Sequence, residues 1–301
     1  MYTKFYGLRR LPFELTSNPE FLFLTPQHSE ALSTLEYGLS SAKPITVLTG
    51  EAGTGKTTLL RAALASERCR RISHVFLDNP TLTRAEFMEM VAARFELGEF
   101  TSKTRLLDSL ESLIRRRHSR REITALVIDE AHVLPNEILE EIRLLGNLET
   151  NTEKLLPVVL VGQPELAQRL NDPALRQLKQ RVALRCDLPA LNLQDTAAYI
   201  ASRIRTAGGD PANIFTREAV ALIYERSRGI PRTISVMCDN ALVSGFALDR
   251  WPVDEDIVLE VCRDFDLGPS TPISMHKSPH LALVLSEADD SGNSVGSRLL
   301  D

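Results

Sequence analysis

The sequence predicts an α/β protein with a parallel five-stranded sheet and helices on both faces, followed by a small C-terminal α-helical domain. Two observations support this fold class. Apolar runs of strand length alternate with longer segments of helical periodicity in the first part of the chain, a pattern typical of a doubly wound parallel sheet. After about residue 190 the strand-like runs stop and only helix-like segments follow. We therefore expect an α/β domain over 41–190 and a helical domain over 191–267.

Five short runs rich in Val, Ile and Leu are the expected strands. Several of them are almost continuously apolar, as strands are when helices cover both faces of the sheet. In chain order the expected strands are 45–49, 73–77, 124–128, 157–161 and 182–188.

The expected helices show apolar residues at intervals of three and four. The first opens with Thr83 and has Glu86 three positions later, which is the pairing of a capping box. The expected helices cover 83–96, 103–117 and 135–149 in the first domain and 194–207, 216–227, 231–248 and 254–265 in the second.

The composition is that of an ordinary globular protein. Of the 301 residues 43% are hydrophobic and 25% are charged, which excludes a disordered or fibrous chain. The first residues show no apolar core of a signal peptide, and no run approaches the roughly 18 apolar residues needed to cross a bilayer. The four cysteines have no metal-ligand spacing, so we expect them to be reduced. The default expectation is a cytoplasmic protein without a direct membrane span.

The segment GEAGTGKT at 50–57 fits the phosphate-binding pattern GxxxxGK[ST] without a mismatch. It follows an expected strand and precedes a helix-like segment, which is the context that the pattern requires. Glycines let backbone N–H groups surround phosphate oxygens, Lys56 can reach the β- and γ-phosphates, and the Thr57 hydroxyl can bind Mg²⁺. The residues expected to bind ATP here are Gly50, Glu51, Ala52, Gly53, Thr54, Gly55, Lys56, Thr57 and Thr58.

An acidic pair, Asp129 and Glu130, follows the apolar run TALVI. Ligands of α/β sheets gather at the carboxyl ends of the strands. If TALVI lies beside the strand 45–49, Asp129 can hold Mg²⁺ through water, and Glu130 can orient and deprotonate the attacking water. The letters Asp-Glu-Ala-His also occur in a helicase group, but that assignment needs a second ATP-binding lobe for which this chain has no room. His132 has either a local hydrogen-bonding role or one in relaying the γ-phosphate state to the helix 135–149.

Four further polar residues are candidates for the same chemistry. Gln163 follows the fourth expected strand and can contact the γ-phosphate or the water. Arg181, or failing that Arg176, precedes the fifth strand and could act on the nucleotide of a neighbouring subunit as an arginine finger; an ordinary surface role stays open for both. Arg232 lies in the first turn of a helix, just after Pro231, which fixes the helix start. We expect Arg232 to contact the γ-phosphate and to report hydrolysis to the helical domain.

Several segments in this order resemble the ExeA/general secretion pathway A group of AAA+ ATPases. They are residues 5–39, TGEAGTGKTTLLR, VIDEAHVL, VGQPEL, LRQLKQRV and RGIPRTISVMCDNAL. The resemblance covers residues 1–265. It implies an AAA+ P-loop core that hydrolyses ATP with Mg²⁺, forms a nucleotide-dependent oligomer and serves an envelope secretion or assembly machine, with recruitment to the inner membrane face by its partners.

The two ends of the sequence carry separate expectations. The family's N-terminal pattern corresponds to Tyr6, Gly7, Leu8, Pro12 and Phe13, in a segment 1–40 that we expect to pack on the ATPase core. This segment either lines the adenine side of the site or is a hydrophobic anchor. Residues 268–301 are rich in Pro, Ser, Gly and Asp, which predicts a disordered tail.

Two departures leave the biological process open. Longer family members continue into a transmembrane helix and a peptidoglycan-binding domain, whereas this sequence resembles the short members linked to pilus, exosortase or exopolysaccharide systems. The same core is similar to helper ATPases of DNA transposition, so the alternative is a DNA-associated AAA+ ATPase, either a transposition helper or an initiator-like protein. The segment RRRHSRR at 115–121 could bind DNA phosphates, an acidic face of another subunit, or only water. The net charge of -5 restricts any nucleic-acid contact to such a local patch. A small-molecule kinase is disfavoured, because a helical lid suits a switch better.

Overall fold

Five parallel strands form one sheet in the order β2-β3-β4-β1-β5. The structure is a computed structural model, and it describes residues 1–15, 19–78, 82–150 and 153–267. The strands are β1 (Ile45–Gly50), β2 (Ile72–Leu77), β3 (Ile123–Ile128), β4 (Val158–Gly162) and β5 (Val182–Leu188). The predicted strands and their parallel pairing are confirmed.

The order of the strands corrects one expectation. The segment TALVI, now β3, does not lie beside β1; β4 lies between them and pairs with both. The chain crosses from β1 to β2 at the edge of the sheet and then returns through β3 to β4, which occupies the place beside β1. As a result the end of β4, where Gln163 follows, lies between the phosphate-binding loop and the acidic pair.

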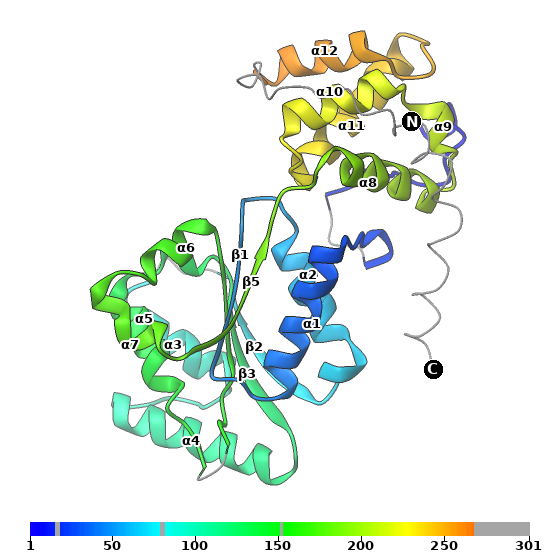
Figure 1. Ribbon diagram of the computed structural model, residues 1–301. Helices are drawn as coiled ribbons and strands as arrows, with labels where there is room; N and C mark the ends of the chain where they lie inside the picture. The colour runs from blue at the N-terminus through cyan, green and yellow to red at the C-terminus, as the bar shows by residue number, and fades with distance from the viewer. Residues whose placement is uncertain (16–18, 79–81, 151–152, 268–301) are drawn as a thin grey trace. The chain divides into compact units, whose positions relative to one another are not determined.

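Helices cover both faces of the sheet (Figure 1). Side chains at alternate positions of the central strands, such as Val47 and Leu160, share a buried core with the helices of one face, because successive strand residues point to opposite faces. The helices of this α/β unit are α1 (Pro26–Ser40), α2 (Lys56–Ala65), α3 (Arg84–Arg94), α4 (Lys103–Ser119), α5 (Asn136–Leu145), α6 (Pro164–Arg169) and α7 (Arg176–Lys179), with short 3₁₀ turns at η2 (Glu67–Cys69), η3 (Ala131–Val133) and η4 (Pro173–Leu175). The predicted capping box of α3 forms, with both Thr83–Glu86 interactions present.

The remaining helices form a second unit with its own core. They are α8 (Leu193–Thr206), α9 (Pro211–Ile214), α10 (Arg217–Ser227), α11 (Pro231–Ala247) and α12 (Glu255–Asp264), preceded by η1 (Pro19–Phe21). The four predicted helices of this region are confirmed, and the short α9 is an addition. Among the described residues, this unit comprises Met1–Thr25, Gly53–Gly55 and the chain from Pro189 to Leu267, and the α/β unit comprises Pro26–Ala52 and Lys56–Leu188.

The N-terminal segment expected over 1–40 is divided between the two units. Helix α1 packs on β1, β5 and α2, whereas Met1–Thr25 groups with the helical unit. There Tyr6 and Phe13 are buried in the core of the helices, and the guanidinium of Arg203 donates to the backbone oxygens of Pro12 and Glu14. Aromatic burial and these hydrogen bonds account for the placement of residues 1–15.

Two further expectations concern membrane-spanning helices and the C-terminal tail. In the part of the chain that the structure describes, no helix is long and apolar enough to cross a membrane. The predicted tail 268–301 lies outside the described residues.

Candidate nucleotide site

The loop 50–57 joins β1 to α2 in a conformation that depends on glycine. Gly53 and Gly55 have φ values of +85° and +96°, in the left-handed region that side chains disfavour. A Cβ atom added at Gly55 would meet no other atom within 4 Å, so the backbone conformation alone requires glycine there. Loops of this kind direct successive N–H groups into one concavity, and α2 contributes the partial positive charge of its N-terminus. The loop is therefore shaped to bind an anion.

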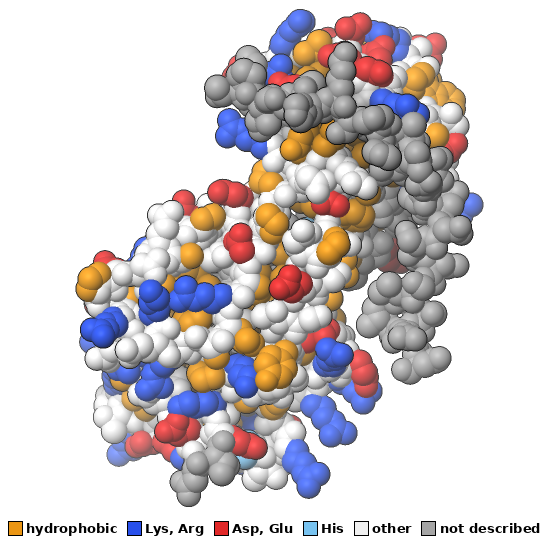
Figure 2. All heavy atoms as spheres, in the orientation of Figure 1, with side chains coloured by type: hydrophobic (Ala, Val, Ile, Leu, Met, Phe, Trp, Pro, Cys, Tyr) orange, Lys and Arg blue, Asp and Glu red, His pale blue; other side chains and the backbone are white. Residues whose placement is uncertain are grey.

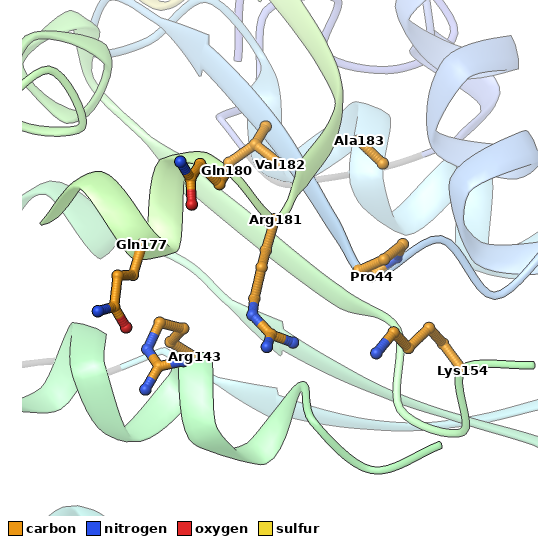
Figure 3. A pocket seen from close by; sticks show the side chains of 8 residues that line it. All are labelled: Pro44, Arg143, Lys154, Gln177, Gln180, Arg181, Val182 and Ala183. Atoms are coloured by element: carbon orange, nitrogen blue, oxygen red, sulfur yellow. The ribbon is translucent and has the colours of Figure 1, made fainter. Parts of the chain in front are cut away.

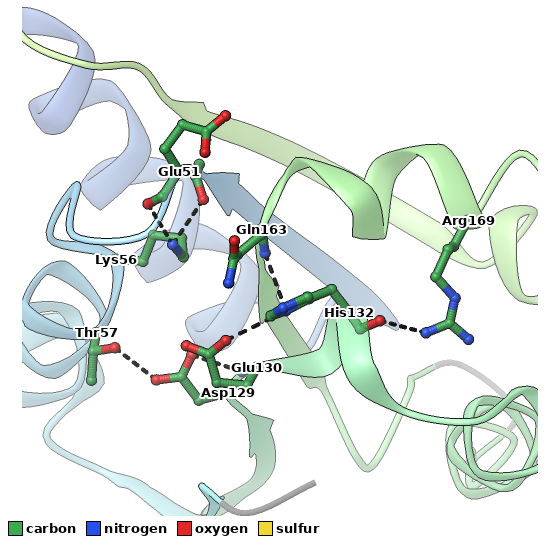
Figure 4. Close-up of polar contacts among 9 residues, drawn as sticks. Glu51, Lys56, Thr57, Asp129, Glu130, His132, Gln163 and Arg169 are labelled. Atoms are coloured by element: carbon green, nitrogen blue, oxygen red, sulfur yellow. Dashed lines mark hydrogen bonds and ion pairs between the residues drawn. The ribbon is translucent and has the colours of Figure 1, made fainter. Parts of the chain in front are cut away.

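Backbone carbonyl groups of the loop hold the side chain of Lys56 in place. Its side chain is buried, and Nζ donates to the carbonyl oxygens of Gly50 and Glu51, at 2.8 Å in each case, as Figure 4 shows. Burial lowers the pKa of Lys56, while the carboxylates of Glu130 and Asp129 act in the opposite direction. An ammonium group that is fixed in place and partly desolvated is well suited to a phosphate oxygen.

Thr57 and the acidic pair meet at the carboxyl edge of the sheet. The Thr57 hydroxyl donates to Asp129 Oδ2 at 2.7 Å, and the other carboxylate oxygen of Asp129 accepts from the N–H of Glu130 at 2.9 Å. Asp129 is buried, whereas the side chain of Glu130 is 47% exposed. Glu130 has a φ of 52°, which is unusual for a residue other than glycine and is common at functional sites. The site therefore places one carboxylate beside the Thr57 hydroxyl and a second one toward solvent.

His132 and Gln163 complete this edge. His132 Nδ1 lies 3.4 Å from Glu130 Oε2 and 3.4 Å from the backbone N of Gln163. The Gln163 side chain points toward the region between Lys56 and Glu130 in Figure 4. Of the expected site residues, Lys56, Thr57, Asp129, Glu130 and Gln163 thus lie together, although they come from three different segments of the chain.

The structure adds two residues that the sequence analysis missed. Asp187, at the same edge on β5, accepts from the Thr49 hydroxyl at 2.9 Å and is one of the carboxylates that act on the pKa of Lys56. Arg169 of α6 donates to the backbone oxygen of His132 at 2.6 Å. The position of Asp187 near the end of an expected strand could have indicated a site residue. No feature of the sequence indicated Arg169.

Arg181 and Arg176 lie elsewhere. Arg181 directly precedes β5, so it is at the edge where the strands begin, opposite to the loop 50–57. It lines a pocket of about 580 Å³ together with Arg143 and Lys154, as Figure 3 shows. Arg176 is exposed at the start of α7. Neither arginine contacts the residues of the acidic edge within the α/β unit.

Arg232 is exposed in the first turn of α11. Its backbone N–H donates to the oxygen of Gly53 at 3.2 Å, and a Cβ atom at Gly53 would lie 2.8 Å from Arg232 Cβ. Glycine is therefore required at position 53 for space as well as for backbone conformation.

Comparisons with known proteins agree with this geometry. Residues 39–170 match the model of the AAA domain family, a span that includes the loop 50–57, the acidic pair and Gln163. The chain is also 40% identical to general secretion pathway protein A of Aeromonas hydrophila over 250 residues, which is 82% of this chain and 45% of the relative.

The chain is an AAA+ ATPase related to general secretion pathway protein A.

A second relative of this ATPase is much more distant. It is an uncharacterised HTH-type transcriptional regulator of Methanocaldococcus jannaschii, 23% identical over 64% of this chain and 47% of the relative. The chain spans about half the length of the curated relatives it matches, with 45% and 47% of them covered.

Solved structures support the fold of the ATPase. The ORC2 protein of Aeropyrum pernix has a TM-score of 0.59 at 17% identity and covers 88% of this chain and 73% of its own. Drosophila ORC bound to DNA has a TM-score of 0.62 at 18% identity, with 85% and 64% covered. The RuvB branch migration motor of Thermotoga maritima has a TM-score of 0.52 at 18% identity, with 85% and 73% covered. At these identities the likeness concerns the fold alone, and it confirms the AAA+ architecture.

Proposed function

We propose that this ATPase binds and hydrolyses ATP with Mg²⁺ and acts as a motor or switch for a bacterial envelope secretion, pilus or exopolysaccharide assembly system. The observation that carries the hydrolytic part is the 2.7 Å contact between Thr57 and Asp129 beside the buried Lys56. The part that concerns the envelope rests on the 40% identity to general secretion pathway protein A.

The residues fit a magnesium nucleotide. Thr57 and Asp129 provide hydroxyl and carboxylate oxygens, the hard ligands that Mg²⁺ prefers. Among the described residues, no group of three or more His, Cys, Asp or Glu side chains could hold a metal by itself, so the ion would depend on phosphate and water oxygens, as is usual for Mg²⁺. When bound, Mg²⁺ would neutralise charge on the phosphates.

The exposed Glu130 carboxylate is placed to act as the general base. It would accept a proton from the water that attacks the γ-phosphorus, while the bond from that phosphorus to the bridging oxygen breaks and ADP leaves with the electron pair. Lys56 and Gln163 would contact the γ-phosphate, and Arg232 would report its presence to the helical unit.

Arg181 is our proposal for an arginine finger that acts on a second copy of the chain. Of the three cations around the pocket in Figure 3, Arg143 is bidentate to Glu140 and Lys154 pairs with Glu149. Among the described residues, Arg181 forms one long hydrogen bond, 3.5 Å, to the oxygen of Gly146, and it acts on the carboxylates of Glu140 and Glu149 without a direct ion pair. This guanidinium is therefore the most available one for a phosphate from outside.

Two variants test the catalytic assignment. Glu130→Gln should retain ATP binding and lose most of its turnover, because an amide cannot accept the proton. Lys56→Ala should instead weaken binding. Turnover at the wild-type rate in Glu130→Gln would remove Glu130 as the base. For the finger, Arg181→Ala subunits mixed with Glu130→Gln subunits should regain activity in mixed oligomers, and strictly additive activities would refute action in trans.

The envelope assignment is tested by co-purification. The tagged ATPase, held in its ATP state by Glu130→Gln, should retain components of an assembly system whose genes neighbour its own. Retention of a transposase would contradict this assignment.

A DNA-associated ATPase is a second candidate, favoured by the arginines where β2 and β3 begin. Ile72 pairs with Ile123, so the preceding residues of both strands lie side by side. No carboxylate among the described residues forms an ion pair with four arginines there: Arg71, Arg116, Arg120 and Arg121. Acidic side chains are interspersed at this end of the unit in Figure 2, which limits the net positive charge.

Binding to a labelled 30-base-pair duplex over a range of salt concentrations tests the second candidate. Four phosphate contacts predict a slope of about -3.6 for log K against log[salt]. Replacing the four arginines by Gln should abolish such binding, and replacing Arg217 and Arg263 of the helical unit should not. Binding that is absent at low salt would eliminate this candidate.

A further inference from the structure

The hydroxyl of Thr49, directly before the loop 50–57, is bonded to the neighbouring strand β5. It donates to Asp187 Oδ1 at 2.9 Å and lies 3.4 Å from the backbone oxygen of Cys186. A hydroxyl has one hydrogen to donate, and the carboxylate is the closer acceptor and the charged one, which makes this bond the stronger of the two. Thr49 is buried and Asp187 is exposed. The carboxyl ends of β1 and β5 are therefore joined by a side-chain hydrogen bond in addition to their backbone pairing.

An irregularity in β5 creates this contact. The strand has one extra residue, Ala183, opposite the interval between Ile45 and Thr46 of β1. Beyond that point the register is shifted by one, and Asp187 lies opposite Thr49. Without the shift Asp187 would lie opposite the next residue of β1, and its side chain would point to the other face of the sheet, because successive side chains alternate. Bulges of this kind redirect side chains beside active sites.

Thr49 leads directly into the peptide group that holds Lys56. The next residue is Gly50, whose carbonyl oxygen accepts from Lys56 Nζ at 2.8 Å, a contact drawn in Figure 4. Because Gly50 has no side chain of its own to pack, the direction of this carbonyl depends on its neighbours. The bond from Thr49 to Asp187 restrains one of those neighbours. One side chain and one peptide group thus connect the carboxylate of β5 to the ammonium group in the loop.

The charge of Asp187 has a separate effect on the site. Burial lowers the pKa of Lys56, and Asp187 is one of the carboxylates that act in the opposite direction. A carboxylate this close to the loop would also repel phosphates through its charge. The hydrogen bond and the charge therefore have different consequences for ATP binding, and substitutions can separate them.

We propose that Asp187 is a positioning residue of the loop 50–57, which it orients through its bond with Thr49. The bond fixes the Gly50 carbonyl and thereby the direction of Lys56 Nζ. This inference rests on the proposed role of Lys56 in binding the phosphates of ATP. When the bond is removed, the Gly50 peptide is less restrained and the ammonium group loses its fixed direction. The alternative is a bond that only attaches β5 to the sheet, and it would influence the free energy of unfolding but not the Kd for ATP.

Paired substitutions at both ends of the bond distinguish these roles by titration calorimetry with Mg-ATP. Thr49→Val removes the donor at nearly constant shape, and Asp187→Ala removes the acceptor. We expect the Kd for ATP to rise about fivefold or more in each, the effect of one lost hydrogen bond. Thr49→Ser keeps the donor, and Asp187→Asn keeps an acceptor oxygen without the charge. We expect Kd in these two variants to stay within about twofold of wild type or to fall below it, because the hydrogen bond is retained.

The chain offers a matched control for each end. Thr124 is a buried threonine of β3 whose hydroxyl has no hydrogen-bond partner among the described residues, so Thr124→Val should leave Kd unchanged. Asp108 is an exposed carboxylate of α4, and Asp108→Ala should likewise have no effect.

Two combined variants test the route of the effect. If Thr49 and Asp187 act through one bond, Thr49→Val with Asp187→Ala should raise Kd no more than the larger single effect. If that bond acts through Lys56, Thr49→Val should not further weaken ATP binding by Lys56→Ala. Additive effects in either combination, equal Kd values in Asp187→Asn and Asp187→Ala, or a wild-type Kd in Thr49→Val would each overturn the inference.

The same measurements separate the inference from the proposed function. Weakened binding in Lys56→Ala together with a wild-type Kd in Thr49→Val would overturn the positioning role alone. A wild-type Kd in a folded Lys56→Ala protein would overturn the proposed phosphate site and the positioning role together. If thermal melting shows that Thr49→Val is unfolded, Asp187→Ala and Asp187→Asn, at an exposed position, decide the matter by the same comparison.

Discussion

Lys56→Ala is the substitution whose effect on ATP binding can be worked out most fully from the structure. An ammonium group has three N–H donors, and two of them are used by the oxygens of Gly50 and Glu51. The third has no recorded acceptor among the described residues. It is therefore free for a phosphate oxygen, and the two carbonyls fix its direction before the nucleotide arrives.

The size of the effect follows from this geometry. A unit charge on phosphate about 4 Å from Nζ gives an attraction of about 4 kcal/mol at an effective dielectric constant of about 20. Part of this is offset by the desolvation that lowers the pKa of Lys56, and hydrogen bonds to charged groups contribute about 1.5–3 kcal/mol net. A loss of about 2–3 kcal/mol corresponds to a rise in Kd for ATP of about 30- to 150-fold.

Titration calorimetry with Mg-ATP measures this Kd directly. Lys179→Ala, an exposed lysine of α7, is the control and should leave Kd unchanged. Thermal melting must show that both variants are folded, since Lys56→Ala also leaves two backbone oxygens without their donor. A rise in Kd of less than about threefold in a folded Lys56→Ala protein would refute the assignment of this lysine to the phosphates.

Three further predictions concern stability. Arg203→Met removes the donors to Pro12 O, Glu14 O and Tyr199 OH. The free energy of unfolding in urea should fall by about 3 kcal/mol, at about 1 kcal/mol per hydrogen bond. Arg205→Met is the control, and an equal loss of stability in both variants would contradict the buried role of Arg203. Lys103→Met leaves the buried Glu141 with the more exposed Arg84 as its ion-pair partner among the described residues. The free energy of unfolding should fall by about 2 kcal/mol. A loss of stability no larger than that of Arg84→Met would disprove this. Burial raises the pKa of Tyr6 from 10.0 to about 12; the unfolded chain thus releases this proton first, and stability should fall as the pH rises from 10 toward 12. Alkaline unfolding curves of Tyr6→Phe should be flatter over that interval, and identical slopes would count against it.

The local parts of the site were predictable from the sequence because each is contained in a few consecutive residues. The pattern at 50–57 specifies glycine, lysine and threonine at set spacing, and strand-length apolar runs mark the ends where Asp129 and Gln163 follow. The strand order was not predictable in this way. Whether β3 or β4 lies beside β1 depends on how crossovers pack, and TALVI and PVVLV are equally apolar.

The shared nitrogen of His132 and the division of residues 1–40 show a second limit. The contact of His132 with Gln163 joins residues 31 positions apart, and no periodicity carries that information. Helix α1 had a usable signal, since Ala31, Leu35 and Leu39 are spaced by four and are buried. The apolar residues before Thr25 belong to a different core, so the helical spacing of α1 is not apparent when residues 1–40 are taken as one segment.

The strand order also bears on how the proposed arginine finger can act. Arg181 precedes β5, and the Asp187 edge with Lys56 lies at the other end of that strand. Seven residues at about 3.3 Å each separate the two ends by about 23 Å, farther than an arginine side chain can reach. Within one α/β unit Arg181 cannot approach phosphates at the position proposed beside Lys56, so a catalytic role for Arg181 requires a second copy. The two edges are different surfaces, and a contact between them is head-to-tail, which generates a ring if the rotation closes and a filament if it does not. The finger therefore implies that turnover per subunit rises with protein concentration, in wild type and not in Arg181→Ala.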